Sequence, residues 1–271
     1  MDDRTSEDLL VLKAHVPGHM RAGHYVRPYE RKEGRAPAPH HHPKPGEDGK
    51  PVLVKQPHLA SAPSTWHNPE ATATFVPGGD VPREINGVPL RRWRDHPTTA
   101  EGWDYVEGVA DDLVEPPLPK TAGEKHIGAG VVIEEPDGRV WLTHPTNAFG
   151  GYEATWPKGT AEDGLSLQAN AIKEAFEETG LKVKIVGFIG DFERTTSVAR
   201  MYRAVRVGGT PIDSGWESQA VSLAPRSHLY EQLNGWADWP IAEKIGAGPQ
   251  PKKPQLPPAA GGKLPLWKKQ S

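Results

Sequence analysis

The stretch from Ser166 to Leu181 most constrains how this chain folds, because it has the pattern of one amphipathic helix with a defined start and end. The Ser166 hydroxyl can accept a hydrogen bond from a backbone N–H of the first turn, and Gly180 can adopt the left-handed conformation that ends a helix. Apolar residues at helical spacing predict a buried face: Ala171, Ile172, Ala175 and Phe176. We therefore expect a helix over residues 166–179 with one face in a core.

The opposite face of the predicted helix carries Glu174, Glu177 and Glu178. Residues three and four positions apart are neighbours on a helix, so these like charges repel one another. A divalent cation removes the repulsion, and ligands that are all oxygen suit Mg²⁺ or Mn²⁺. Taken alone, the three glutamates also fit a solvated acidic face.

The surroundings of the glutamates favour the metal. The spacing is that of the Nudix box, the signature of the Nudix hydrolases, at Gly159, Glu174, Ala175, Glu177, Glu178, Gly180 and Leu181. The lead-in Trp156-Pro-Lys-Gly also resembles this family. Two positions depart from the box. Leu165 stands where the family has its first glutamate, and Lys173 stands where it has arginine, which keeps the charge but loses the bidentate fork. Glu162 or Asp163 could replace the missing carboxylate.

The resemblance implies a Nudix-type α/β/α sandwich with a mixed sheet. It also implies a hydrolase, with Mg²⁺ or Mn²⁺ as cofactor, that cleaves a pyrophosphate bond in a nucleoside diphosphate linked to another group, of nucleotide or dinucleoside polyphosphate type. The metal ligands it implies are the Gly159 carbonyl, Glu174, Glu177, Glu178 and Glu217.

Two of these carboxylates are also candidates to activate the attacking water. The family uses a carboxylate from a loop after the box, and Glu217 has that placement, so it is our candidate for a metal ligand or the general base. Glu174 has the same possible role. Glu193 is the second candidate for the base, and its alternative is an ion pair with Arg194 or Arg200, a minor contribution at a surface.

Cations are needed to bind the substrate phosphates. Lys158 is the first candidate, because it belongs to the lead-in of the box. Arg194 and Arg200 lie on or near strands that flank the cleft in this fold, and their alternative is an ordinary surface charge.

Two other function classes stay open. Leu165 favours a catalytically degenerate fold that binds a nucleotide or another protein without hydrolysis, and the long arms favour a scaffold for protein interactions. The three retained glutamates argue against both, because a scaffold has no need for like charges crowded on one face.

Strand patterns surround the helix in the order the resemblance implies. The predicted strands cover residues 127–134, 140–143, 152–156, 183–192, 198–207 and 219–223, and two helices follow at 226–233 and 239–245. We expect the Nudix domain to span residues 125–245.

The two ends differ in composition from this domain. Residues 1–80 are rich in Pro and His without apolar periodicity, which predicts a largely disordered segment; metal binding by its histidines is the alternative. Residues 81–124 predict an ordered arm that packs on the core through Trp93, Trp103 and Tyr105, with base stacking by a tryptophan as the alternative. Residues 246–271 predict a basic, Pro-rich tail.

Composition limits the partners and the compartment. The formal net charge of −3 gives no general affinity for nucleic acid, so we expect a nucleotide-type small molecule as the partner and no nucleic acid. The chain has no cysteine, which excludes disulfides and Cys-based zinc sites. We find no apolar run that could span a bilayer and no signal-peptide pattern, and we expect a cytoplasmic protein without a membrane partner. The oligomeric state stays open.

Overall fold

The computed structural model describes residues 57 and 59–251, except the side chain of Glu124. Upstream of these it describes only the backbone of six short strands, β1 (Lys13–Val16), β2 (His19–Arg21), β3 (His24–Val26), β4 (Tyr29–Lys32), β5 (His41–His42) and β6 (Val52–Leu53), paired as β1–β4, β2–β3 and β5–β6. The predictions for the histidine-rich segment before residue 57 and for the basic tail after residue 251 lie outside the described side chains.

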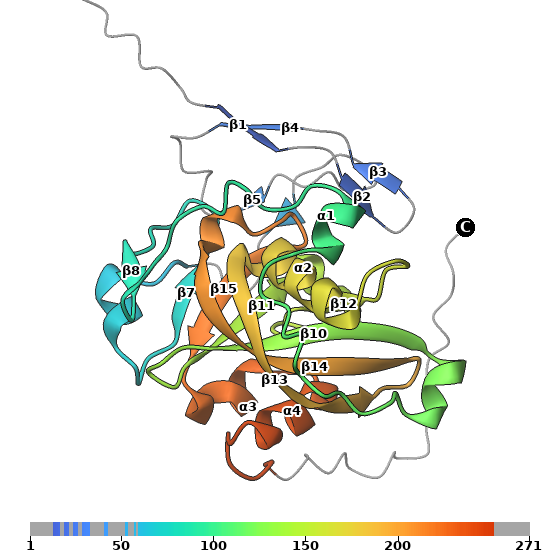
Figure 1. Cartoon of the computed structure of the whole chain (residues 1–271). Helices are drawn as coiled ribbons and strands as arrows, with labels where there is room; N and C mark the ends of the chain where they lie inside the picture. Colours follow the sequence, from blue (N-terminus) through green and yellow to red (C-terminus); the bar gives the residue numbers. More distant parts are fainter. Residues whose placement is uncertain are drawn as a thin grey trace, which may run out of the picture.

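A mixed sheet of seven strands forms the centre of the molecule (Figure 1). Along the sheet the order is β13 (Leu181–Glu193), β14 (Ser197–Gly209), β10 (His126–Glu134), β11 (Val140–Pro145), β15 (Ser218–Ala224) and β7 (Ala73–Phe75), and β12 (Lys158–Thr160) pairs with β10 beside this path. Among the paired neighbours of this sheet, only β10 and β14 are parallel, and the other pairs are antiparallel. A separate hairpin joins β8 (Glu84–Ile85) to β9 (Val88–Pro89).

The helix α2 (Leu167–Thr179) begins and ends where its sequence predicts. The Ser166 hydroxyl accepts from the Ala169 backbone N–H at 3.1 Å. Gly180 is left-handed with φ 71°, and its N–H donates to the Phe176 carbonyl at 2.7 Å. A Cβ on Gly180 would lie 2.2 Å from the Thr210 carbonyl oxygen, so this helix end admits no other residue without a shift.

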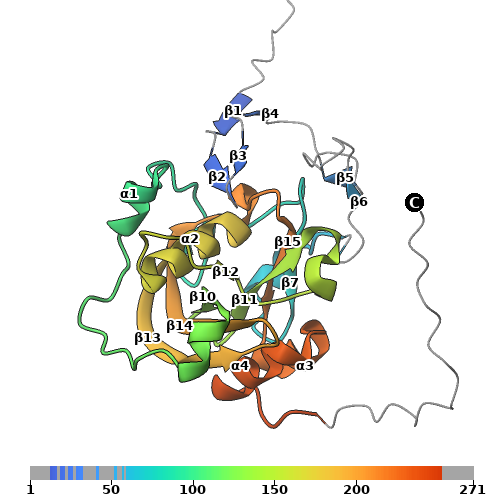
Figure 2. The same ribbon diagram turned by 90° about the vertical axis from the view of Figure 1, so that its right-hand side faces the viewer.

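Helices cover both faces of the sheet, which confirms the predicted sandwich (Figures 1 and 2). One apolar cluster joins α2 to the sheet through Ile172, Leu181 and Tyr202, and a second joins the opposite face to the C-terminal helices through Met201, Leu229 and Ile241. The remaining helical segments are η1 (Pro63–His67), α1 (Ala100–Asp104), η2 (Lys120–Glu124), η3 (Thr146–Gly151), η4 (Pro211–Asp213), η5 (Arg226–His228), α3 (Leu229–Gln232), η6 (Trp236–Asp238) and α4 (Trp239–Lys244).

The arm before β10 lies against α2 through aromatic rings. Trp93 and Trp103 have ring centroids 5.2 and 6.0 Å from that of Phe176, and both are buried. These contacts give the two tryptophans a packing role. Tyr105 differs from the expectation: it is 80% exposed, because it follows the last turn of α1 and its side chain contacts no core cluster.

Three local features differ from those expected. Residues 59–80 carry η1 and β7, with Trp66 fully buried, so part of the segment expected to be disordered belongs to the sheet. Residues 152–156 form no strand and make only an isolated bridge between Thr143 and Thr155. The helix expected over residues 226–233 is divided into η5 and α3.

Candidate functional site

The carboxylate of Glu174 lies directly against the backbone of Gly159. A Cβ on Gly159 would lie 2.2 Å from both Cδ and Oε1 of Glu174. Glu174 is 7% exposed on α2, and Gly159 lies in β12, which pairs with Gly128–Gly130 of β10. Gly130 permits this approach, because a Cβ there would lie 2.4 Å from Cβ of Lys158. Two glycines therefore bring the strand and the helix carboxylate together.

The other two box glutamates have defined partners. The Lys158 backbone N–H donates to Oε2 of Glu178 at 2.9 Å. The Lys173 ammonium donates to Oε2 of Glu177 at 3.2 Å and to Oε1 of Glu162 at 2.6 Å. Burial alone lowers the pKa of Lys173, but Glu177 and Glu162 raise the pKa above its ordinary value. Lys173 is therefore charged between the box helix and the preceding loop.

The loop that carries Glu217 is fixed to the C-terminal end of α2. The Gly215 N–H donates to the Glu177 carbonyl at 2.6 Å, and the Thr146 N–H donates to the Glu217 carbonyl at 2.6 Å. The Thr143 hydroxyl contacts Ser218 at 2.5 Å and donates to the Glu178 carbonyl at 3.4 Å. The structure thus brings the backbone of Glu217 beside the helix turn that carries Glu177 and Glu178.

Lys158 and Arg194 both lie against Tyr152. The Lys158 ammonium donates to the Thr155 hydroxyl and lies 5.2 Å from the Tyr152 ring centroid. Arg194 donates to the Tyr152 hydroxyl at 2.7 Å and pairs with the buried carboxylate of Asp238. Burial lowers the pKa of Lys158, an effect that Asp238 opposes and the charge of Arg194 reinforces. Both cations therefore lie in the field of Asp238, and Arg194 is the one that pairs with it directly.

Arg200 and Glu193 lie in other surroundings. Arg200 pairs with both oxygens of Asp191 at 2.8 Å and donates to Glu115 at 3.0 Å and to the Pro116 carbonyl at 2.9 Å. These bonds fasten the arm to the sheet, so we omit Arg200 from the proposed phosphate site. Glu193 accepts from Thr121 and Lys125, which lower its pKa, and not from the arginines considered from the sequence.

Comparison with protein families matches the NUDIX domain to residues 124–244. This part of the chain is a NUDIX domain. Two curated proteins named RNA pyrophosphohydrolase, from two strains of Caulobacter vibrioides, are 39% identical over 59 residues, which is 21% of this chain and 34% of each relative. The chain therefore matches about a third of the length of these relatives.

Solved structures with a similar fold include a NUDIX hydrolase from Nitrosomonas europaea, at 21% identity and a TM-score of 0.40, covering 45% of this chain and 70% of that chain. A MutT protein from Methanosarcina mazei Go1 has 16% identity and a TM-score of 0.37, covering 45% of this chain and 92% of that chain.

The donor set of the NUDIX domain fits a hard divalent cation, because carboxylate and carbonyl oxygens suit Mg²⁺ and Mn²⁺. The space above Gly159 is filled by the Glu174 carboxylate, and Glu178 lies one helical turn further along the same face. Among residues 57–251, no three Asp, Glu, His or Cys side chains already converge on one point. A metal therefore requires these side chains to turn toward one another.

Asp238, Tyr152 and Thr155 were not among the residues predicted from the sequence. Asp238 is fully buried and accepts from the Thr155 hydroxyl at 2.5 Å across 83 positions of the chain. The Trp-rich segment around Asp238 offers only a weak signal, an acidic residue between apolar ones. Long-range contacts of this kind leave no periodic pattern in a sequence.

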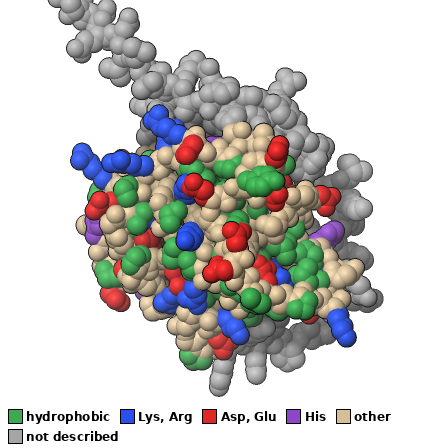
Figure 3. Space-filling model, in the orientation of Figure 1, with side chains coloured by type: hydrophobic (Ala, Val, Ile, Leu, Met, Phe, Trp, Pro, Cys, Tyr) green, Lys and Arg blue, Asp and Glu red, His purple; other side chains and the backbone are tan. Residues whose placement is uncertain are grey.

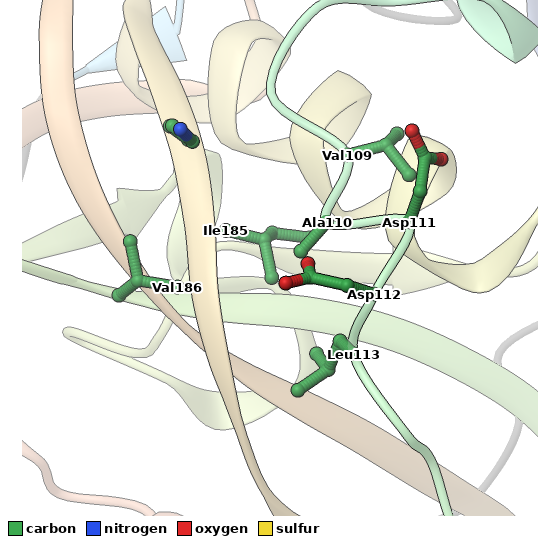
Figure 4. Close-up of a pocket in the computed structure, with 8 residues that line it drawn as sticks. Val109, Ala110, Asp111, Asp112, Leu113, Ile185 and Val186 are labelled. Atoms are coloured by element: carbon green, nitrogen blue, oxygen red, sulfur yellow. The ribbon is translucent and has the colours of Figure 1, made fainter.

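A separate open hollow of about 570 Å³ lies between the arm and the edge strand β13, lined by residues 109–113 and 184–186 (Figure 4). The Ile185 N–H donates to the Gly108 carbonyl at 2.8 Å beside it. None of the predicted site residues lines it. Acidic and basic side chains are interspersed over the face of the molecule seen in Figure 3. No helix in the described part of the chain is long and apolar enough to cross a membrane.

Proposed function

We propose that this NUDIX domain is a Mg²⁺-dependent or Mn²⁺-dependent pyrophosphohydrolase that acts on a nucleoside diphosphate linked to another group. The single observation that carries the proposal is the contact of the buried Glu174 carboxylate with the backbone of Gly159, which lies in the strand of the box. A solvated acidic face does not bury a carboxylate to 7% exposure against the backbone of a strand.

In this proposal Glu174, Glu178 and the Gly159 carbonyl hold the metal, and Glu177 and Glu217 complete the set. The bound metal supplies neutralisation of the phosphate charge and a more acidic water. The backbone N–H of Lys158 donates to one Glu178 oxygen and so orients this carboxylate beside the box strand. Glu217 or Glu174 then takes the proton of the attacking water.

Lys158 and Arg194 are the proposed phosphate-binding cations. Both lie against Tyr152 next to the box, and Arg194 is held there by its ion pair with the buried Asp238. The relatives named RNA pyrophosphohydrolase support the reaction type. We favour a small nucleotide over RNA, because the net charge is −3 and a nucleic-acid surface requires an excess of basic side chains.

The test is a substrate panel with Mg²⁺ and with Mn²⁺, read by phosphate release from the products. The panel includes nucleoside diphosphate sugars, dinucleoside polyphosphates and an RNA with a terminal pyrophosphate. We expect turnover of at least one small nucleotide, and a loss of about a hundredfold or more in the Glu174→Gln and Glu178→Gln double variant, because misplaced groups at a reacting centre have effects of this size. Glu231→Gln, an exposed acid on α3, is the matched control.

Metal-induced thermal stabilisation, read together with turnover, separates a metal-dependent hydrolase from a catalytically degenerate binder. A ligand that binds only the folded state raises the melting temperature, so we expect millimolar Mg²⁺ or Mn²⁺ to stabilise the wild type and not the double variant. Stabilisation by metal and nucleotide with no turnover of any substrate would instead establish the catalytically degenerate binder.

A further inference from the structure

The box of this chain lacks the first carboxylate of the family, yet Lys173 has two anionic partners. Its ammonium lies 2.6 Å from Oε1 of Glu162 and 3.2 Å from Oε2 of Glu177. The Lys173 side chain is 8% exposed, so its charge is held in a poorly solvated place. A buried ammonium requires a carboxylate close by, because its desolvation is otherwise costly.

The loop before α2 holds Glu162 in place from two directions. The Glu162 N–H donates to Oδ1 of Asn170 at 3.0 Å, and Asn170 is fully buried on α2. The Glu162 carbonyl accepts from the Leu165 N–H at 3.2 Å, which closes a turn. The Leu165 side chain packs against the core cluster that contains α2. Leu165 therefore anchors the loop by apolar contact, and Glu162 provides its charge.

We propose that Glu162 is a positioning residue that neutralises Lys173 and thereby keeps the box glutamates available to the metal. This inference rests on the proposed function, because it concerns the same metal site. Glu177 and Glu174 are the other carboxylates whose charges act on Lys173. Without Glu162, the ammonium draws these two carboxylates to itself and competes with the divalent cation for them.

Glu162→Gln is the informative variant, because it keeps the size and removes only the charge. Its side chain is 39% exposed, so the variant folds. We expect the metal concentration for half-maximal activity to rise about tenfold, as on loss of other groups that orient metal ligands. The rate at saturating metal stays close to that of the wild type, because the metal ligands themselves remain. Glu162→Asp keeps the charge and restores part of the metal affinity.

Asp163→Asn is the matched control, since it removes the same charge from the neighbouring exposed position. A general effect of charge near the site weakens metal binding equally in both variants, and that result overturns the proposal. An unchanged metal dependence in Glu162→Gln also overturns it.

The second readout is independent of turnover: the rise in melting temperature on addition of Mg²⁺ or Mn²⁺. We expect the metal-free melting temperatures of the wild type and Glu162→Gln to be similar, with a smaller metal-induced rise in Glu162→Gln and a full rise in Asp163→Asn. If the wild type hydrolyses nothing but shows this pattern, the proposed function fails and the role of Glu162 stands. If turnover is metal-dependent and the three proteins respond equally to metal, the role of Glu162 fails and the proposed function stands.

Discussion

Gly159 has no Cβ, and this allows the Glu174 carboxylate to lie against its backbone. A Cβ at position 159 would be 2.2 Å from the Glu174 carboxylate, well inside any contact distance that real side chains show. The helix cannot retreat, because α2 is fixed at both ends by its caps and below by the core. Any side chain at this position must therefore move the carboxylate.

We expect Gly159→Ala to lower kcat about a hundredfold, because a displacement of about 1 Å at a reacting centre has effects of that size. We expect only a small effect on stability, because the atoms that the new Cβ would meet are the end of a side chain that can turn away. Steady-state kinetics and thermal melting measure the two effects. Gly123→Ala is the control, since a Cβ at Gly123 meets no atom within 4 Å and should change neither quantity. Wild-type kinetics in Gly159→Ala would contradict the placement of Glu174.

At the scale of residues, the sequence predicted contacts between side chains that are close together along the chain. Glu174, Glu177 and Glu178 share one helix, so their spacing alone places them on neighbouring turns. Arg200 has equally clear chemistry, but its partner Glu115 is 85 positions away and no local pattern reveals the pair. Whether a cation faces solvent, substrate or a partner depends on contacts of that kind.

At the scale of elements, a buried histidine joins β11 to its neighbours. His144 is 4% exposed, with Nδ1 2.7 Å from the Glu153 carbonyl and Nε2 2.8 Å from the Ser222 hydroxyl. A carbonyl only accepts, so Nδ1 carries the proton and Nε2 accepts from Ser222. Burial lowers the pKa of His144 to about 4, and the bond to Glu153 opposes the shift in part. The fold thus requires the neutral ring.

The pH dependence of stability follows from the sign of this shift. Between pH 6.5 and about 4 the unfolded chain binds a proton at His144 and the folded chain does not, so stability falls as the pH falls through this range. The loss amounts to about 3 kcal/mol at the lower limit. Urea unfolding at a series of pH values should show that the free energy of unfolding depends less steeply on pH in His144→Asn than in the wild type.

His67→Asn removes a histidine that is exposed at the end of η1 and should retain the wild-type dependence. If the free energy of unfolding falls equally steeply with pH in all three proteins, His144 does not contribute to the pH dependence of stability.

The elements differ in how far their sequences predict them. The limits of α2 depend on Ser166 and Gly180, which act within one turn, and both were predicted correctly. The strand β12 has only three residues, and its pairing with Gly128–Gly130 places it, a contact that no periodicity within residues 158–160 encodes. The strand β7 is equally short and was missed for the same reason.

For the whole molecule, the segment before the arm is part of the core. Trp66 is fully buried and its ring centroid lies 5.9 Å from that of Trp141. We expect Trp66→Ala to lower the free energy of unfolding by about 3–5 kcal/mol, as for other buried aromatic truncations. Trp236→Ala, at a residue that is 45% exposed, should cost about 1 kcal/mol or less. Denaturant unfolding compares the two.

Truncations extend the same prediction. A chain that begins at Pro57 keeps every strand of the central sheet and should melt like the full chain. A chain that begins at Val81 lacks Trp66 and β7, exposes the edge of β15, and should unfold at lower denaturant or aggregate. If the shorter chain is as stable as the longer one, the contribution of residues 59–80 is small.

The position of β7 at the far edge of the sheet sets an order of events when the protein is made. The Thr74 hydroxyl contacts Ser222 of β15 across 148 positions. At a translation rate of roughly 5–20 residues per second, β7 waits on the order of ten to thirty seconds for its neighbour to be synthesised. Closing such a long loop is entropically unfavourable until the strands between have paired. During that interval the first strand of the sheet to leave the ribosome is the last to find its partner.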